Sequence, residues 1–322
     1  MGIIGYGRIA SRFIPESKYV SGINIESVYG MNPHKLEEFS QKHELNSWHT
    51  NFDEFMETVD AVYVASPHLT HYEYVKKLLN NNKHVLCEKP IVLSKKEAEE
   101  LFDLASKLNL ILFEGIKTTY APCFVQLIGL AKSGVIGNIK NVEGTFTKLV
   151  TDKSLREYNL QLGGGSITEL ASYPLSAIAK LLGNDYVNCN FTTYKDKETQ
   201  VDLLTKINLI YPESMATAVV GIGCKQEGSL VVSGTKGYIY VPAPWWKTEY
   251  FEIRFEDPAK TRKVFTKFES DGLRYELSEF LISINNRHKS HKLTNKDSIF
   301  ISEIIEKFRN NENTYTIRES NN

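Results

Sequence analysis

Short apolar runs alternate with helical patterns over the first third of the chain. The runs at 2–4, 23–29, 60–65, 84–87 and 109–114 predict buried β-strands. Helix starts lie between them, at Asn32-Pro33 and at the capping boxes Thr70-x-x-Glu73 and Ser94-x-x-Glu97. This βαβαβαβαβ order predicts an α/β fold with a parallel sheet, right-handed crossovers and helices on both faces. Ligands of such a sheet bind at the carboxyl ends of its strands.

The pattern changes after about residue 120. A helix at 122–132 leads into a β run at 139–149, and further strands are expected at 201–211, 215–223, 229–233, 238–241 and 250–255. Because little helix separates these strands, they predict a largely antiparallel sheet. Helices return at 276–284 and 296–308, and the polar end Ser320-Asn321-Asn322 is expected to fray. The change of pattern predicts two domains, 1–118 and 119–322.

Composition narrows the classes of partner. The 322 residues include 38 lysines and arginines against 39 aspartates and glutamates, so no nucleic acid partner is expected. No apolar run approaches the roughly 20 residues of a membrane helix, so no membrane partner is expected. No basic stretch precedes an apolar one, as a signal peptide would require. Cys87, Cys123, Cys189 and Cys224 stand singly, which predicts neither a zinc site nor a disulfide framework and fits a reducing cytoplasm.

A glycine-rich turn follows the first strand. The residues Gly5-Tyr6-Gly7-Arg8-Ile9-Ala10 fit the G-x-G-x-x-G/A turn of a dinucleotide-binding unit. Gly5 allows the tight turn, Gly7 lets the backbone approach a pyrophosphate, and Ala10 lets the helix pack closely on the sheet. A turn without any phosphate ligand fits the same residues. The motif therefore favours a dinucleotide site only because it directly follows the first strand.

Glu88-Lys89-Pro90 ends the apolar run at 84–87, where a parallel strand delivers side chains to a bound ligand. The Lys89 ammonium reaches the mouth of the sheet, Glu88 can hold it, and Pro90 fixes the turn that follows. Lys89 is therefore a candidate proton donor. The alternative is a surface turn with a solvated ion pair.

A glycine run precedes one helix of the second domain. Gly163-Gly164-Gly165 exposes backbone at the start of a helix expected at 167–182, where a polar or anionic ligand can dock. Glu169 and Tyr173 are four residues apart, so a carboxylate and a phenol share one helix face. The alternative is equally open, because Ser166-x-x-Glu169 fits a capping box and Tyr173 fits a packed core.

Four further features have plainer interpretations. His68 and His71 form a candidate metal pair, but no third ligand lies nearby, so no metal is predicted. Gly234-Thr235-Lys236-Gly237 favours a hairpin turn over a phosphate loop. Trp245-Trp246 favours core packing or a subunit contact over a substrate platform. Pro174 is expected to kink or restart its helix.

In combination, these motifs resemble the Gfo/Idh/MocA oxidoreductases, which include glucose-fructose oxidoreductase, inositol dehydrogenase and dimeric dihydrodiol dehydrogenase. The resemblance covers nearly the whole chain. It rests on the Gly5 turn, Ala65-Ser66-Pro67 with His71, Cys87-Glu88-Lys89-Pro90, Gly134-Val135-Ile136-Gly137, Gly163-Gly164-Gly165 with Glu169 and Tyr173, and Gly234-Thr235-Lys236-Gly237. It implies a Rossmann dinucleotide-binding domain at 1–118 and a C-terminal α+β substrate domain at 119–322. The large, mostly antiparallel open sheet of the second domain would support a homodimer or homotetramer.

The resemblance also implies NAD or NADP as cofactor and a small sugar or polyol as substrate in the cleft between the domains. It makes Lys89 the catalytic lysine, while Glu169 stands where the family usually has Asp and Tyr173 where it has His or Tyr. Hydride passes directly between nicotinamide and substrate, so the protein moves only the hydroxyl proton, a task for Lys89 and Tyr173 that Glu169 orients or tunes. The expected cofactor-binding residues are Gly5, Gly7, Arg8, Ile9, Asn32, Ser66, Pro67, His71, Glu88 and Lys89.

The chain departs from the family pattern at two places. The dihydrodiol dehydrogenase branch, which the tyrosine most resembles, usually has a tryptophan and an arginine where this chain has Lys117 and Thr119. After the second strand, Gly30-Met31-Asn32 offers neither a carboxylate for a ribose 2′-hydroxyl nor an arginine for a 2′-phosphate, so NAD and NADP both stay open. His34 and Lys35 either favour a phosphate or form solvated surface.

The leading hypothesis is an NAD(P)-dependent dehydrogenase or reductase that acts on CH–OH groups of a carbohydrate, polyol or sugar derivative. A cofactor-binding protein without turnover, in a sensor or assembly role, is the first alternative and is motivated by the replaced loop residues. A glycosidase that uses tightly held NAD transiently is the second.

Overall fold

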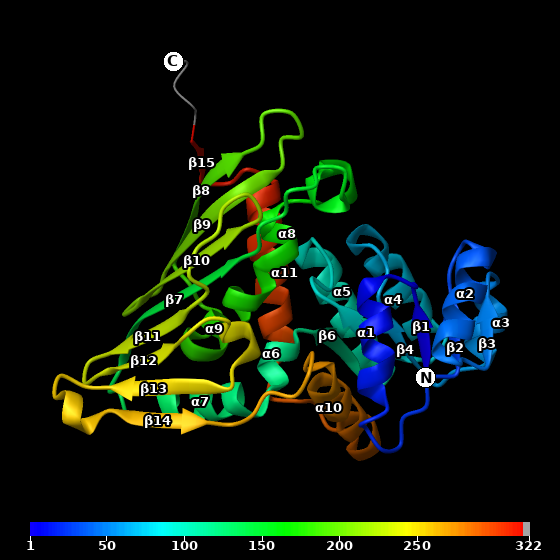
Figure 1. Ribbon diagram of the computed structural model, residues 1–322, viewed down its shortest axis with the longest axis horizontal. Helices are drawn as coiled ribbons and strands as arrows, with labels where there is room; N and C mark the ends of the chain where they lie inside the picture. The colour runs from blue at the N-terminus through cyan, green and yellow to red at the C-terminus, as the bar shows by residue number, and fades with distance from the viewer. Residues whose placement is uncertain (318–322) are drawn as a thin grey trace. The chain divides into compact units, whose positions relative to one another are not determined.

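The computed structural model describes residues 1–317, so the expected frayed end at Ser320-Asn321-Asn322 lies outside the described residues. The chain forms two compact units (Figure 1). The first joins Met1–Tyr120 to Glu269–Asn295, and the second joins Ala121–Phe268 to the segment that begins at Lys296.

The first unit contains a parallel sheet of six strands in the order β3-β2-β1-β4-β5-β6. The strands are β1 (Gly2–Ile4), β2 (Ser27–Tyr29), β3 (Ser47–His49), β4 (Ala61–Val64), β5 (His84–Glu88) and β6 (Leu112–Gly115). The predicted parallel sheet is confirmed. Strand β3 is an additional strand, which no apolar run in the sequence predicted. Strand order reverses between β1 and β4, so the ligand crevice of this topology lies at the carboxyl ends of these two strands.

Helices flank this sheet on both faces. They are α1 (Arg8–Ser17), α2 (Pro33–His43), α3 (Phe52–Glu57), α4 (His71–Asn80), α5 (Lys95–Lys107), α6 (Lys117–Tyr120) and α10 (Leu273–Asn286), with the 3₁₀ turn η1 (His68–Thr70). Asn32 caps α2 as its position predicts, and its Oδ1 accepts from the Lys35 N–H at 3.1 Å. The predicted capping boxes at Thr70 and Ser94 are wrong, because neither side chain makes a capping hydrogen bond. Thr70 closes η1 with helical backbone angles, whereas a cap needs an extended backbone.

Helix α10 follows the second unit's sheet in sequence but packs on α1, α6 and β5 of the first unit (Figure 1). Its Arg274 guanidinium makes two bonds to the buried Glu16 carboxylate of α1, at 2.9 and 3.0 Å, and the Arg274 backbone N–H makes a third at 3.2 Å. Its Phe280 ring packs against Phe113 of β6 with centroids 5.6 Å apart. The core of the first unit is therefore completed by a segment from near the end of the chain.

The second unit contains a sheet of nine strands in the order β14-β13-β12-β11-β7-β10-β9-β8-β15. The strands are β7 (Ile139–Thr147), β8 (Asn188–Lys195), β9 (Asp202–Ile210), β10 (Met215–Gly221), β11 (Leu230–Gly234), β12 (Tyr238–Val241), β13 (Tyr250–Arg254), β14 (Arg262–Phe265) and β15 (Thr314–Thr316). Among the strands that residues 1–317 form in this sheet, only β7 with β10 and β8 with β15 pair in parallel, which confirms the predicted, mostly antiparallel sheet. Residues 234–237 form the predicted hairpin turn, in which the Gly234 N–H donates to the Gly237 carbonyl at 2.8 Å.

One face of this sheet is covered by helices (Figure 1). They are α7 (Pro122–Lys132), α8 (Ser166–Leu170), α9 (Ser172–Leu182) and α11 (Asn295–Arg309). Short 3₁₀ turns lie at η2 (Arg156–Tyr158), η3 (Leu160–Leu162), η4 (Trp245–Lys247) and η5 (Pro258–Lys260). The strands alternate accordingly: Ala216, Ala218 and Val220 of β10 are buried, whereas the residues between them are partly exposed. Within residues 1–317, no helix is both long and apolar enough to cross a bilayer.

Candidate functional site

The turn after β1 has the local geometry that a bound pyrophosphate requires. Gly5 has φ +100°, and a Cβ there would lie 2.7 Å from the Ala65 carbonyl oxygen, so the fold itself demands glycine. A Cβ on Gly7 would meet no protein atom within 4 Å. Gly7 is therefore not needed for packing, and its bare backbone leaves room for a ligand to approach. Ala10 is fully buried where α1 packs on the sheet.

The first turn of α1 is open to an anion. No side chain caps this helix, so its first N–H groups have no capping partner, and the helix dipole points its positive end at the carboxyl edge of the sheet. Arg8 is exposed and Ile9 half-buried at this end. These features fit the pyrophosphate of a dinucleotide.

The end of β2 is shaped by Tyr6. A Cβ on Gly30 would overlap the Tyr6 ring, so the ring lies directly on the backbone that leads to Asn32. The Asn32 side-chain oxygen Oδ1 caps α2 by accepting from the Lys35 N–H. His34 and Lys35 are exposed on the first turn of this helix.

His71 ties the turn after β4 to the turn after β5. It is fully buried, with Nδ1 2.9 Å from the Pro90 oxygen and Nε2 2.9 Å from the Ser66 oxygen. Burial lowers the pKa of His71, so the neutral ring donates to one of these carbonyls. Both ring nitrogens face backbone oxygens and are unavailable to a metal. Across residues 1–317, no group of three histidine, cysteine or acidic side chains is arranged to hold a metal ion.

Glu88 is a buried anchor beneath Lys89. The residue is 9% exposed, its Oε1 accepts from the Tyr63 hydroxyl, and its Oε2 accepts from the Lys89 backbone N–H at 3.2 Å. Burial raises the pKa of Glu88, while the Lys89 charge and the Tyr63 hydrogen bond oppose that rise. Lys89 itself is half-buried, and its peptide bond to Pro90 is cis. The alternative of a solvated surface pair therefore does not describe Glu88.

Sequence reasoning missed the groups that surround Glu88. Tyr63 lies inside β4, where its ring stacks on Phe13 with centroids 3.8 Å apart. Lys117 acts electrostatically on both Glu88 and Glu276 of α10. Nothing in the sequence indicates a functional role for Tyr63, because a tyrosine in an apolar strand is ordinary. Nothing indicates one for Glu276, because the residues around it are remote in sequence. Lys117 was noted only as a departure from a family pattern.

In the second unit, Asp202 fixes the glycine run at the start of α8. Its Oδ2 accepts from the Ser166 hydroxyl and from the Ile167 N–H, the latter at 2.8 Å. Gly165 has φ +114°, and a Cβ there would overlap the Asp202 carboxylate. Asp202 is fully buried, and burial raises its pKa to about 6. The cap of α8 thus comes from β9 and not from Glu169, so the capping-box interpretation is wrong.

Glu169 and Tyr173 stand on two consecutive short helices. Helix α8 ends at Leu170 and α9 starts at Ser172, with Pro174 in the first turn of α9, where its missing N–H costs no helix bond. The Glu169 Oε1 lies 2.7 Å from Nη2 of Arg156, a residue that sequence reasoning did not single out. Lys89 belongs to the first unit, whereas Glu169 and Tyr173 belong to the second.

Tyr173 begins a row of aromatic rings in the second unit. Its ring centroid lies 5.0 Å from that of Phe146 on β7, and Phe146 stacks on Trp246 at 3.6 Å with planes 6° apart. Trp245 is fully buried, and its Nε1 donates to the Thr145 carbonyl at 2.8 Å. The two adjacent tryptophans therefore differ: Trp245 is core, and Trp246 extends the row that starts at the candidate catalytic phenol.

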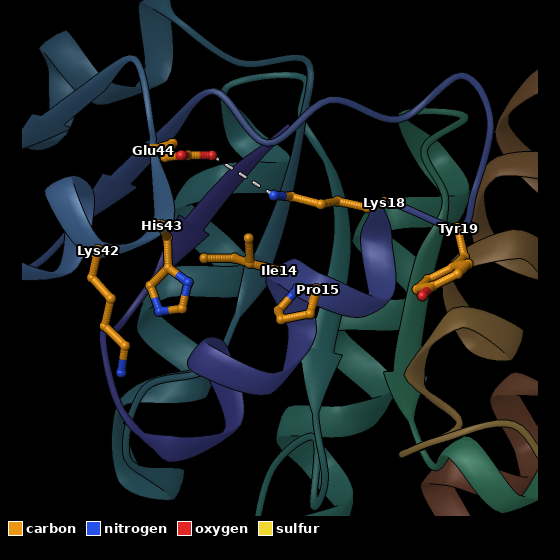
Figure 2. A pocket seen from close by; sticks show the side chains of 7 residues that line it. All are labelled: Ile14, Pro15, Lys18, Tyr19, Lys42, His43 and Glu44. Atoms are coloured by element: carbon orange, nitrogen blue, oxygen red, sulfur yellow. Dashed lines mark ion pairs between the residues drawn. The ribbon is translucent and has the colours of Figure 1, made fainter.

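A cavity of about 520 Å³ lies elsewhere on the first unit (Figure 2). It is lined by Ile14, Pro15, Lys18, Tyr19, Lys42, His43 and Glu44, and the Lys18 ammonium lies 3.9 Å from the Glu44 carboxylate. These residues lie at the C-terminal ends of α1 and α2. Because crossover helices run against the strands, this cavity is at the amino edge of the sheet, away from the edge where ligands of this topology bind.

Comparisons with known proteins agree with this fold. A family model described as an oxidoreductase family with an NAD-binding Rossmann fold (GFO_IDH_MocA) matches residues 1–116, and a GFO/IDH/MocA C-terminal domain model matches residues 124–240. The scyllo-inositol 2-dehydrogenase (NADP(+)) of Bacillus subtilis is 26% identical over 95% of this chain and 95% of its own. The trans-1,2-dihydrobenzene-1,2-diol dehydrogenase of Xenopus tropicalis is 24% identical over 85% of this chain and 86% of its own.

Two solved structures share the complete fold. A 3-ketoreductase from Actinomadura kijaniata, in complex with NADP and TDP-benzene, has a TM-score of 0.86 at 20% identity and covers 98% of each chain. The aldose-aldose oxidoreductase from Caulobacter crescentus, complexed with glycerol, has a TM-score of 0.86 at 20% identity and covers 96% of each chain. These likenesses confirm the Rossmann sheet followed by a large mixed sheet.

Proposed function

Because the chain belongs to the Gfo/Idh/MocA family of oxidoreductases, we propose that it transfers hydride between NAD or NADP and the hydroxyl or carbonyl carbon of a small sugar, polyol or sugar derivative. The observation that carries this proposal is Lys89 at the carboxyl end of β5, with the buried Glu88 carboxylate beneath it. Glu88 bonds the Lys89 backbone N–H and feels the Lys89 charge, which supports Lys89 as a proton donor where the fold binds its ligands.

The turn at Gly5 and Gly7, with the free N–H groups at the start of α1, would hold the pyrophosphate. Ser66 and Pro67 would form the neighbouring wall at the end of β4, and the buried His71 would hold that turn through the Ser66 oxygen. When bound, the nicotinamide supplies the carbon that accepts or donates hydride. The protein then has to move only the proton of the substrate hydroxyl.

Lys89 gives that proton in reduction and takes it in oxidation, and the Tyr173 hydroxyl is the second candidate for moving it. Glu169 bonds to Arg156 and so acts as an anchor for the start of the helix pair that carries Tyr173. The named relatives that act on an inositol and on a dihydrodiol support a substrate with neighbouring hydroxyl groups. The row Tyr173, Phe146 and Trp246 supports a substrate with an apolar face, as the C–H face of a sugar ring provides.

Turnover is tested with purified protein, each cofactor in turn, and a panel of aldoses, inositols, sugar nucleotides and dihydrodiols. The absorbance of the reduced nicotinamide reports reaction in either direction. We expect turnover with at least one polyhydroxylated substrate. Tight binding of cofactor with no turnover across the panel, in both directions, would instead support a protein that binds the dinucleotide without using it.

Lys89→Ala is expected to lower kcat by about 10²- to 10⁴-fold, the usual contribution of a positioned proton donor. Cofactor affinity should change little, because the pyrophosphate contacts lie at the Gly5 turn. The control is Lys83→Ala, which removes an ammonium that bonds the Val59 carbonyl at 2.8 Å, before the start of β5. Equal activity of the Lys89 variant and the wild type would rule out this role.

We also propose that the protein is a homodimer or homotetramer built on the face of the nine-stranded sheet that carries no helix in the described part of the chain. Its four cysteines are free thiols, which supports a reducing, cytoplasmic location. Light scattering coupled to gel filtration tests the first point: a monomeric mass at micromolar concentration would contradict it.

A further inference from the structure

Glu276 is a buried carboxyl group that the proposed reaction does not use. It lies on α10, it is fully buried, and neither of its side-chain oxygens has a hydrogen-bond partner. A carboxyl group without hydrogen bonds is costly to bury, so its presence calls for a physical explanation.

The Glu276 carboxyl group lies against the strand end that delivers Lys89. A Cβ on Gly115 would lie 3.6 Å from each Glu276 oxygen, and Gly115 of β6 is paired with Glu88 of β5. Helix α10 packs against both β5 and α6. The Glu276 carboxyl group therefore lies near Glu88, at the end of β5 that leads to Lys89.

Four elements place charged or titratable groups around Glu276. Glu88 of β5, Lys117 of α6 and Glu16 of α1 act on it electrostatically, and it acts in turn on Tyr63 of β4. Burial is the largest effect and raises the pKa of Glu276 well above its ordinary value, and the Glu88 charge raises it further.

The remaining neighbours change this balance little. Glu16 is itself neutralised by Arg274, whose Nη2 lies 2.9 Å from it. Cys87 and Glu114 act on one another beside Glu88, and burial raises the pKa of the Cys87 thiol well above its ordinary value, so it stays uncharged. The electrostatic question is therefore which of the two acids, Glu88 or Glu276, carries the charge.

Of the two acids, only Glu88 accepts hydrogen bonds that stabilise a carboxylate. Glu88 accepts hydrogen bonds from the Tyr63 hydroxyl and the Lys89 N–H and feels the charges of Lys89 and Lys117. Glu276 accepts no hydrogen bond and has Lys117 alone as a favourable charge. Because two neighbouring buried acids do not both ionise readily, Glu88 carries the charge and Glu276 keeps the proton.

We propose that Glu276 is a positioning residue that acts on Lys89 through Glu88, as the uncharged member of a buried carboxyl pair. The inference rests on the proposed function to the extent that Lys89 is taken as the proton donor. With Glu276 neutral, a single anion lies beneath Lys89, and the ammonium can release its proton to a substrate oxygen. An ionised Glu276 adds a second anion, which favours the ammonium and makes Lys89 a poorer donor.

The charge state of Glu276 is tested without any substrate, by replacing it with groups that cannot ionise. We compare the wild type with Glu276→Gln and Glu276→Leu. The matched control is Glu279→Gln on the same helix, where the carboxylate bonds Lys292 at 2.7 Å and the pKa is lowered below its ordinary value. Infrared spectra should show a C=O band of a protonated carboxylic acid at neutral pH in the wild type and the control. That band should be weaker by one group in either Glu276 variant.

The pH dependence of unfolding gives an independent result. A raised folded pKa means that the folded protein holds the proton more tightly than the unfolded chain. Stability therefore falls as pH rises from the ordinary value of 4.5 toward the folded pKa, and this fall should be smaller in both Glu276 variants. The Glu279→Gln control should show the same loss of stability with rising pH as the wild type. It should also be less stable at neutral pH, because it lacks the carboxylate with the lowered pKa. If both Glu276 variants kept the wild-type infrared band and the wild-type loss of stability with rising pH, the proposal that Glu276 is uncharged would be wrong.

The action on Lys89 is tested by competitive labelling with acetic anhydride, since only the unprotonated amine reacts. Mass spectrometry follows the Lys89 peptide from neutral to alkaline pH. At the alkaline pH values where Glu276 is ionised in the wild type, Lys89 should react about three- to tenfold faster in the two variants than in the wild type. A tenfold difference corresponds to a shift of about one pH unit in the protonation equilibrium of the amine. At lower pH the rates should match, and the Glu279 control should follow the wild type throughout.

Identical Lys89 labelling in the wild type and both variants at every pH would overturn the positioning role. Agreement of the glutamine and leucine variants with each other identifies the lost charge, and not the lost polar group, as the cause. None of these measurements uses turnover. A protein that transfers no hydride would thus refute the proposed function while leaving the result on Glu276 intact.

Discussion

At the scale of single residues, the Tyr63 hydroxyl stabilises the Glu88 carboxylate together with the charge of Lys89. It donates to Oε1 from a ring that is fully buried and stacked on Phe13. Burial disfavours a carboxylate and raises the pKa of Glu88, whereas each hydrogen bond to Glu88 favours the ionised form.

Tyr63→Phe is expected to lower the free energy of unfolding by about 1–3 kcal/mol, because it leaves a buried carboxylate oxygen without its donor while the ring stack is kept. Chemical denaturation at neutral pH measures the change. Tyr72→Phe is the matched control: its hydroxyl donates to the exposed Glu100 at 2.7 Å, and its loss should cost less than about 0.5 kcal/mol. Equal losses in the two variants would mean that the Glu88 bond is no stronger than a surface contact.

The sequence identified residues whose chemistry is visible in their own neighbourhood. Lys89 was found because a lysine directly follows an apolar strand, and Tyr173 because its spacing from Glu169 is helical. Tyr63 and Glu276 were not found, because their roles come from contacts between strands and helices remote in sequence. Arg156 was not found for the same reason, because nothing in the sequence of its 3₁₀ turn indicates the ion pair with Glu169.

At the scale of elements, the turn between β1 and α1 separates two uses of glycine. Gly5→Ala should cost about 1–3 kcal/mol of stability, because φ +100° and a Cβ 2.7 Å from the Ala65 oxygen strain the backbone. Gly7→Ala meets no protein atom and should cost at most about 1 kcal/mol, as an alanine at an N-cap. The same change should weaken NAD(P) binding at least about tenfold, equivalent to roughly 1.4 kcal/mol. Calorimetric titration and thermal melts of both variants measure this, and unimpaired cofactor binding by the Gly7 variant would argue against the pyrophosphate at this turn.

Helix α8 depends on a cap supplied by another element. The fully buried Asp202 has a pKa raised to about 6 from 3.8, so the folded protein holds this proton more tightly than the unfolded chain. Stability should fall by about 3 kcal/mol as pH rises from 3.8 to 6, at 1.36 kcal/mol per unit, and then stay level. Asp202→Asn should remove this fall.

Asp196 is the control for Asp202, because its shift has the opposite sign. Hydrogen bonding to Lys153 lowers its pKa to about 2, so its contribution is present above pH 3.8 and is lost as pH falls toward 2. Asp196→Asn should therefore leave the fall between pH 3.8 and 6 in place. Should both variants show the wild-type pH profile over that range, another group would have to carry the titration.

Element by element, periodicity predicted the strands well and the helix ends less well. Strands such as β9, β10 and β12 follow apolar alternation closely, whereas Ser47-Trp48-His49 has no apolar run and forms β3 through pairing with β2. The capping box at Ser166 failed because a carboxylate from another element bonds the start of that helix. Asp202 took the α8 cap in this way, and it lies 36 residues from Ser166.

At the scale of the whole molecule, the first unit is not a continuous stretch of sequence. Helix α10 comes from residues 269–295 yet contributes Leu273, Leu277 and Phe280 to the core of that unit. Pattern alone shows an amphipathic helix there but not which sheet it covers, since both units offer an apolar surface. The carboxyl pair behind Lys89 follows directly from this return of the chain.

Residues 1–120 alone are therefore expected not to form the native first unit. Without α10, Phe113 loses its partner Phe280, and the buried Glu16 carboxylate loses all three bonds from Arg274. Removing the partner of a buried charge costs several kcal/mol, comparable with the roughly 5–15 kcal/mol that holds a domain folded. The fragment should bind a hydrophobic dye and melt without a cooperative transition, whereas the same fragment joined to residues 269–295 by a flexible linker should melt cooperatively and bind NAD(P). Cooperative melting of 1–120 with native cofactor affinity would show that α10 is dispensable to the unit that carries Lys89.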